Sequence, residues 1–262
     1  MSHPIVIHAG FHKTGTSTVQ RFLKGHRAAL KPHAVVVLKG RMDALISAAR
    51  GYSTWRDPIT LAKFARRADD LAQSLTHVRR RALILSAEEL SGHMPGRAGI
   101  DDYSATAPLI GELAAAFHRH RKAPDLRLAY GVRDGAEWLE SAYWEHVKSS
   151  SMTEDYTDFA ARIGPVDLTC VAQGIAAQTG LPLTLIPLKS NQPLGPAAPL
   201  LALAQIPLDG LRPEPPRNTR PAPDLLPQLL HINRTEPDRA RRRAAKQALL
   251  RAAPLSNGPE DG

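Results

Sequence analysis

One glycine-rich segment near the start of the sequence has the residue types and spacing of a phosphate-binding loop. It reads GFHKTGTST from Gly10 onward, after a short β-branched run at Ile5–Ala9 and before a segment with helical spacing of apolar residues. In a strand-loop-helix arrangement, backbone N–H groups and the helix N-terminus can hold phosphate oxygens. Gly10 and Gly15 keep the glycine spacing of nucleoside triphosphate loops, but Thr16 stands where those loops have their lysine, and the lysine is Lys13.

A second motif contains residues that are suited to bind a second phosphate group. Arg133 and Asp134 end an apolar run at Leu126–Val132, and Ser141 follows the arginine by eight positions. An arginine at a strand end presents a planar, fixed donor group to a phosphate, and a serine two turns into the next helix adds a hydroxyl. An arginine capping a sheet edge explains the same residues, so this motif gains its weight from the first loop.

Both motifs resemble those of the sulfotransferases that use 3′-phosphoadenosine 5′-phosphosulfate (PAPS). In that family the first loop reads approximately K-[ST]-G-T-[ST], and the 3′-phosphate site is a strand ending in Arg-Asp with a serine eight positions after the arginine. The resemblance covers Ile5 to about Lys148. It implies a P-loop-like α/β fold, PAPS as the donor, no metal ion, and a lysine on the bridging oxygen of the donor. The implied donor-binding residues are Lys13, Thr14, Gly15, Thr16, Ser17, Thr18, Arg133 and Ser141.

A weaker resemblance lies nearer the C-terminus. The segment PRNT at 216–219 precedes a helix-like segment that ends near Asn233, similar to a C-terminal segment of bacterial members of the family. Arg217 and Asn218 are therefore further candidates for covering the nucleotide. A proline-rich surface loop explains them nearly as well.

Sulfuryl transfer also needs a base that takes the proton of the acceptor. Glu88 and Glu89 follow the apolar run at Ala82–Leu85, which we expect to border the cleft. Adjacent residues of an extended chain point to opposite sides, so one of the two is expected to be structural, and Glu88 is the first candidate. His12 and Asp43 are alternatives, because members of the family carry a histidine or a glutamate in this role.

The acceptor is much less well defined than the donor. The resemblance implies a hydroxyl or amine of a carbohydrate or small metabolite. Aromatic and cationic side chains that can line a pocket for it are Trp55, Arg56, Tyr143, Trp144 and His146. Aromatic residues on helices more often pack in the interior.

Two other classes of protein are alternatives. A P-loop kinase or nucleoside triphosphatase would use Ser17 on a magnesium ion, but it needs a lysine after Gly15. A nucleic-acid-binding or scaffold protein would use the basic segment at 239–251, but that segment lacks interleaved aromatic residues and matches no nucleic-acid-binding motif. A sulfotransferase-like protein that binds the donor without turnover also fits the motifs.

The candidate residues require a scaffold that brings distant strand ends together. Apolar runs alternate with helix-like segments, which predicts an α/β fold: a three-layer P-loop-type open parallel sheet flanked by helices, with ligands at the carboxyl ends of the strands. The expected strands are Ile5–Ala9, Ala34–Leu38, Ala82–Leu85, Leu126–Val132 and Leu183–Pro187. The expected helices lie at 16–30, 58–78, 106–120, 134–148, 166–179 and 238–252. The proline-dense segment 190–224 predicts an irregular covering segment. We expect one domain over residues 1–252 and a disordered tail over 253–262.

The composition agrees with a globular enzyme that binds an anion. Apolar residues make up 43% and charged residues 23% of the 262 residues. Lys and Arg outnumber Asp and Glu by 34 to 25, which gives a formal charge of +9 and suits an anionic ligand. Cys170 is the single cysteine, so no intrachain disulfide can form. Without an export signal or a membrane-length apolar run, the expected location is the cytoplasm.

Overall fold

The protein is an α/β fold built on a five-stranded, all-parallel sheet, as the sequence predicts. The computed structural model describes residues 3–189, 191–213 and 224–252. The strands are β1 (Ile5–His8), β2 (Ala34–Leu38), β3 (Ala82–Ser86), β4 (Leu126–Val132) and β5 (Leu183–Pro187). Their order in the sheet is β2-β3-β1-β4-β5, so β1 lies in the centre and its loop lies between the ends of β3 and β4.

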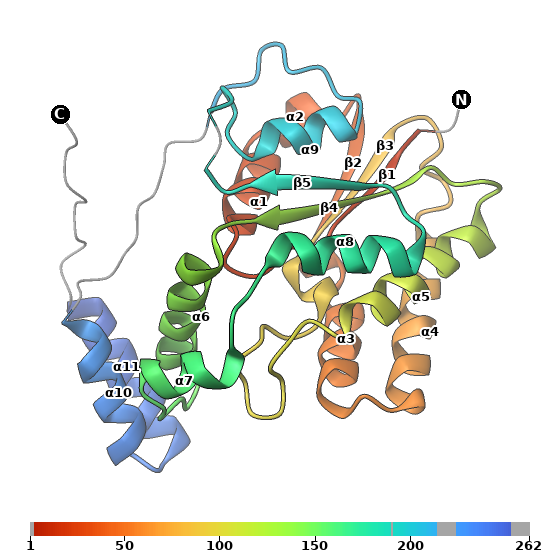
Figure 1. Ribbon diagram of the computed structural model, residues 1–262. Coiled ribbons are helices and arrows are strands. Elements are labelled where there is room, and N and C mark those ends of the chain that lie inside the picture. The colour runs from red at the N-terminus through yellow and green to blue at the C-terminus, as the bar shows by residue number, and fades with distance from the viewer. Residues whose placement is uncertain (1–2, 190, 214–223, 253–262) are drawn as a thin grey trace.

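Helices cover both faces of the sheet (Figure 1). The helices are α1 (Thr16–Gly25), α2 (Arg27–Leu30), α3 (Asp43–Trp55), α4 (Pro58–Ser74), α5 (Thr106–His120), α6 (Gly135–Ser149), α7 (Tyr156–Ile163), α8 (Leu168–Thr179), α9 (Ala197–Leu203), α10 (Leu225–Thr235) and α11 (Arg239–Ala252), with short 3-10 turns η1 (Lys39–Arg41) and η2 (Glu88–Ser91). The short α1, α2 and α9 lie on one face, and α3, α4, α5 and α8 lie on the other. Among the described residues, no helix combines the length and the apolar character needed to cross a membrane.

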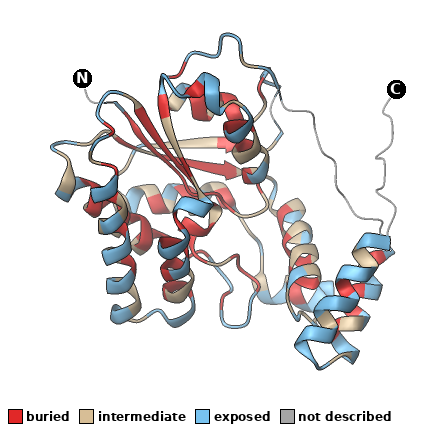
Figure 2. Ribbon diagram, turned by 180° about the vertical axis from the view of Figure 1, so that it is seen from behind, coloured by how far each residue is buried: buried red, intermediate tan, exposed pale blue. Residues whose placement is uncertain are grey.

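The alternation of side chains along the strands divides the core into two layers. Val6 packs into the cluster under α1 and α9, whereas Ile5 and Ile7 pack into the larger cluster on the opposite face. All four residues of β1 are buried, because helices cover the sheet on both sides. The burial colouring in Figure 2 follows this arrangement, with buried residues in the sheet and on the inner faces of the helices.

Three helices were not anticipated from the sequence. These are α3, α7 and α9. The third lies within the proline-dense segment, where Leu200 and Leu201 are fully buried against the sheet. Prolines forbid long helices but allow a single short one with an apolar face. The expected helix at 16–30 is divided at His26 into α1 and α2.

A C-terminal helical hairpin packs against α6 through a buried lysine and a buried asparagine, Asn233, whose Nδ2 donates to Val147 O at 2.9 Å. Lys246 of α11 donates hydrogen bonds from Nζ to Val147 O at 2.8 Å, Ser150 O at 2.6 Å and Asn233 Oδ1 at 2.9 Å. The first two acceptors lie at the end of α6, whose last carbonyls have no partners within the helix. Burial and the charge of Arg242 lower the pKa of Lys246 to about 8. The hairpin thus caps the helix that follows Arg133.

Candidate functional site

The loop between β1 and α1 presents backbone donors at a helix N-terminus. Gly15 adopts a left-handed conformation with φ 88° and begins α1. A Cβ at this position would lie 2.6 Å from Leu188 Cδ1, so both the backbone angle and the space favour glycine. Within the described residues, the N–H groups of Gly15, Thr16 and Ser17 find no hydrogen-bond acceptor. Donors of this kind at a helix start are suited to hold an anion.

The threonine hydroxyls of the loop hold the loop itself. Thr14 Oγ1 and Thr16 Oγ1 donate to Phe11 O at 2.6 Å and 3.1 Å. Thr18 Oγ1 accepts a hydrogen bond from Arg21 at 3.3 Å, and Ser17 is exposed. The two buried threonines therefore shape the cradle, and Ser17 is the hydroxyl of this loop that is open to solvent.

Strand β4 and helix α6 bring Arg133 to the same loop. Asp134 accepts a hydrogen bond from the Glu137 N–H at 2.9 Å, so the acid of the Arg-Asp pair is the N-cap of α6. Arg133 Nη1 donates to Lys13 O at 3.1 Å, and Nη2 donates to Glu137 Oε2 at 3.1 Å. The Nε–H of Arg133 is buried and has no acceptor among the described residues. Two motifs that lie 120 residues apart in sequence are therefore in direct contact.

One face of α6 carries the counter-ions of these cations. Glu145 Oε2 accepts from Lys13 Nζ at 3.0 Å and from Lys148 Nζ at 2.8 Å. Burial would raise the pKa of Glu145, but the hydrogen bonds and charges of Lys148 and Lys13 outweigh it and lower the pKa to about 2. Ser141 lies one turn from both Glu137 and Glu145 on this face. The serine of the second motif thus lies between the partners of Arg133 and of Lys13.

A pocket of about 540 Å³ adjoins Arg133 at the ends of β4 and β5. Its volume lies in the range of ligand pockets, about 300–1,000 Å³. Lys189 also lines it, and its Nζ donates to Glu137 Oε1 at 2.7 Å. Hydrogen bonds from Lys189 and Arg133 lower the pKa of Glu137. The lining residues are Val132, Arg133, Asp134, Gly135, Glu137, Val166, Asp167, Thr169, Pro187, Leu188 and Lys189.

The two candidate glutamates have different surroundings. Glu88 lies against the loop, since a Cβ on Gly10 would be 3.1 Å from its Cα and its Cβ, and its Oε2 accepts from Gln20 Nε2 at 2.9 Å. Glu89 is buried and its Oε1 accepts from both Lys39 Nζ and Arg50 Nη2. The two ion pairs give Glu89 a structural role. Of the two, Glu88 has the surroundings of a base.

His12 and Asp43, the other base candidates, are less suited to the role. Burial, followed by the influence of His93, Arg50, Lys39 and His146, lowers the pKa of His12 to about 3. A neutral imidazole with such a pKa holds a proton weakly. Asp43 is exposed in the first turn of α3, where a negative charge favours the helix N-terminus.

The aromatic residues expected around an acceptor pocket do not gather in one place. Trp55 is 71% exposed at the end of α3, beside Arg56, whose guanidinium lies over the Tyr52 ring. Tyr143 and His146 are buried on α6 and pack against Phe159. Arg217 and Asn218, the candidates for covering the nucleotide, lie outside the described residues.

Several residues of the site were missed by sequence reasoning. These are Gln20, Glu137, Glu145, Leu188 and Lys189. A signal was present for two of them, because Arg133, Glu137, Ser141 and Glu145 recur at intervals of four and so share one helix face. Leu188 and Lys189 follow the last strand at the same sheet edge, where ligands of open parallel sheets bind.

No protein-family model matches the chain, and no curated protein matches it in sequence. The described residues contain no group of three or more His, Cys, Asp or Glu side chains placed to hold a metal ion.

Proposed function

We propose that this protein is a sulfotransferase that moves a sulfuryl group from PAPS to a hydroxyl or amine of a carbohydrate or small metabolite. The observation that carries the proposal is the contact between Arg133 Nη1 and Lys13 O, because it joins the two phosphate motifs into one site. The free N–H groups at the start of α1 and the unpartnered Nε–H of Arg133 support it, since each is a donor suited to a phosphate oxygen.

The donor would lie along the edge formed by β1, β4 and β5. The N–H groups of Gly15, Thr16 and Ser17 would hold the 5′-phosphosulfate, and Arg133 with Ser141 would hold the 3′-phosphate. The pocket beside Arg133 would receive the nucleoside. In this arrangement motifs from different parts of the chain would bind the two ends of the donor.

The reaction breaks the bond between sulfur and the bridging oxygen of the donor and forms a bond from sulfur to the acceptor oxygen or nitrogen. The acceptor proton passes to Glu88, and the leaving group is adenosine 3′,5′-bisphosphate. Lys13 stabilises the negative charge that develops on the leaving phosphate oxygen. Lys13 has a left-handed backbone φ of 62°, and its ammonium, which pairs with Glu145 in the free protein, would turn to the leaving oxygen when the donor binds.

Calorimetric titration with adenosine 3′,5′-bisphosphate tests the proposal without knowledge of the acceptor. We expect binding without a metal ion, tighter than for ADP or 5′-AMP, because both of those lack the 3′-phosphate. ATP with magnesium in the same assay tests the kinase alternative. Binding of ATP with magnesium in place of the bisphosphate would overturn the proposal.

Two variants test which motif binds which phosphate end of the nucleotide. Arg133→Ala should reduce the preference for the bisphosphate over 5′-AMP by about 10- to 100-fold, because a charge-assisted hydrogen bond contributes about 1.5–3 kcal/mol. Lys13→Ala should weaken the binding of both ligands and abolish sulfuryl transfer. Lys24→Ala, at an exposed position of α1, is the matched control and should bind both ligands as the parent does.

A further inference from the structure

A second cluster of charges lies at the other half of the same sheet edge. Lys39 follows β2, Glu89 lies in the turn after β3, and Arg50 reaches them from α3. Glu89 Oε1 accepts from Lys39 Nζ and, at 2.9 Å, from Arg50 Nη2. The Glu89 side chain is 5% exposed, whereas those of Lys39 and Arg50 are 48% and 42% exposed. We call these three residues the Glu89 cluster; its carboxylate is buried and its cations reach solvent.

The Glu89 cluster lies close to the proposed transfer point and away from the nucleotide. The strand order places β3 and β2 on one side of β1, and β4 with Arg133 on the other. Glu89 directly follows Glu88, whose Cα and Cβ would lie 3.1 Å from a Cβ on Gly10, so the cluster adjoins the loop that carries Lys13. In the proposed arrangement the nucleotide occupies the β4–β5 side of β1, which would leave the β3–β2 side to the acceptor.

The charged groups of the Glu89 cluster that reach solvent are both cations. Two cations share one carboxylate oxygen in the Glu89 cluster, and Arg97 adds a third, with its Nη1 2.9 Å from His93 Nδ1. Burial, Arg97 and Arg50 lower the pKa of His93 to about 4, so its imidazole is neutral at pH 7. Outside the cluster, Glu88 accepts from Gln20, and Asp101 and Glu154 pair with Arg162.

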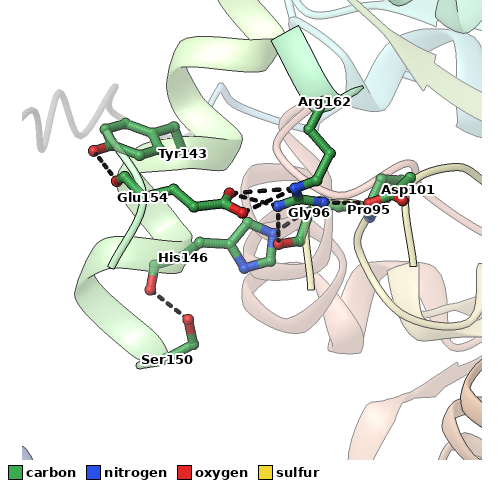
Figure 3. Close-up of polar contacts among 8 residues, drawn as sticks. All are labelled: Pro95, Gly96, Asp101, Tyr143, His146, Ser150, Glu154 and Arg162. Atoms are coloured by element: carbon green, nitrogen blue, oxygen red, sulfur yellow. Dashed lines mark hydrogen bonds and ion pairs between the residues drawn. The ribbon is translucent and has the colours of Figure 1, made fainter. Parts of the chain in front are cut away.

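The loop that carries His93 and Arg97 is fixed to α6 and α7 (Figure 3). Arg162 of α7 pairs with Glu154 and Asp101 and donates to Gly96 O at 3.2 Å. His146 lies 2.7 Å from Pro95 O through its Nε2. A Cβ at Gly96 would lie within 2.5 Å of Phe159, so the loop packs closely on both helices. The loop that carries Arg97 is therefore held in place before any ligand binds.

We propose that Lys39 and Arg50 select an acceptor that carries an anionic group, a carboxylate, sulfate ester or phosphate ester, near the hydroxyl or amine that receives the sulfuryl group. The inference rests on the proposed function and specifies its substrate class. The side chains of Lys39 and Arg50 are partly exposed, so they can donate hydrogen bonds to an oxyanion. The buried carboxylate of Glu89 fixes their orientation.

The experiment compares matched sugars on the protein saturated with adenosine 3′,5′-bisphosphate. Methyl β-D-glucoside is the neutral reference, and methyl β-D-glucuronide, methyl β-D-glucoside 6-phosphate and methyl β-D-glucoside 6-sulfate are the anionic members, so the three arms distinguish the anionic groups. Binding is measured by calorimetry, and transfer is measured with PAPS. At least one anionic member is expected to bind at least about tenfold more tightly than the neutral sugar, as one charge-assisted hydrogen bond allows.

Lys39→Gln and Arg50→Gln should each remove most of that preference and leave binding of the neutral sugar unchanged. Each single variant keeps one cation on Glu89, and thermal unfolding confirms that it folds. Lys39→Arg should restore the preference, and Lys63→Gln, exposed on α4, should not affect it. The inference would be overturned if the parent protein bound neutral and anionic sugars equally, or if the variants lost affinity for both kinds of sugar to the same extent. Binding of the bisphosphate would still uphold the proposed function in either case. Failure of the bisphosphate itself to bind would overturn both.

Discussion

Gly131 gives the sharpest test of how the sheet supports the phosphate loop. This glycine lies in β4, its N–H donates to Gly10 O, and its carbonyl accepts from the Phe11 N–H at 3.4 Å. A Cβ added there would lie 2.4 Å from Thr14 Oγ1 and 3.0 Å from Thr14 O. Since ordinary contacts begin at 3.4 Å, Gly131→Ala would require Thr14 Oγ1 to move by about 1 Å (3.4 − 2.4) and Thr14 O by about 0.4 Å (3.4 − 3.0). The backbone of the loop would have to move with it.

Two effects of Gly131→Ala are expected. Forcing a methyl group into a packed site destabilises by about 1–3 kcal/mol, which corresponds to about 2–4 °C in Tm per kcal/mol. A displacement of about 1 Å in a positioning element costs about 100-fold in catalysis. The affinity for adenosine 3′,5′-bisphosphate should also fall by at least about tenfold, although Gly131 contacts no part of the proposed ligand.

Differential scanning calorimetry and calorimetric titration measure the two effects separately. Gly174→Ala is the control, because Gly174 lies in α8 with nothing within 4 Å of an added Cβ. Alanine is the better helix former by up to about 1 kcal/mol, so this variant should keep its affinity and keep or raise its Tm. A Gly131→Ala variant with parental affinity and parental Tm would show that the strand does not determine the position of the loop.

Three further predictions concern charged and titratable groups. Glu145→Gln should strengthen bisphosphate binding by up to about fivefold, because it removes an anion that competes for Lys13; Glu140→Gln, exposed on the same helix, is the control, and unchanged affinity would refute the competition. Burial lowers the pKa of His8 from 6.5 to about 4. Between these two pH values the unfolded chain binds a proton that the folded protein does not bind. The free energy of unfolding should therefore fall by up to about 3 kcal/mol as the pH falls from 6.5 to 4. His8→Asn should lessen that loss in urea unfolding at pH 7 and pH 4, and equal losses in both proteins would contradict it. Lys246→Met should destabilise by about 2–4 kcal/mol in urea unfolding, because Ser150 O and Asn233 Oδ1 lose their donor and, among the described residues, Val147 O keeps only Asn233 Nδ2, yet leave bisphosphate affinity intact; a parental unfolding midpoint would show that the lysine is dispensable.

The strands were predictable because their apolar runs are short, β-branched and followed by polar residues. All five are found where the sequence places them. The loop between β1 and α1 was predictable for a different reason. Glycines at positions 10 and 15 indicate places where the backbone lies close to other atoms and leaves no room for a side chain. The role of Asp134 as the N-cap of α6 also follows from local chemistry. Local rules therefore account for the elements and for the local conformation of each proposed phosphate motif.

The contacts between motifs were not predictable from local patterns. Nothing in the residues near Lys13 indicates that Glu145 holds its ammonium, because the pairing depends on the packing of α6 across the loop. Likewise, Glu89 and Glu88 are adjacent in sequence, but only the fold shows that Lys39 and Arg50 converge on Glu89. Ion pairs between residues 39 to 132 positions apart carry no local sequence signal.

The two carboxylates on α6 bear on why the site should prefer a doubly phosphorylated nucleotide. Glu137 holds Arg133, and Glu145 holds Lys13, so each phosphate group of a ligand must compete with a carboxylate for its cation. A ligand with one phosphate can displace only one of these pairings. A ligand with a 5′- and a 3′-phosphate can displace both and can also use the donors at the start of α1 and the Nε–H of Arg133. Replacing Glu137 by glutamine should therefore improve 5′-AMP binding less than it improves bisphosphate binding, and an equal gain for both ligands in calorimetric titration would show that Glu137 does not compete with the 3′-phosphate.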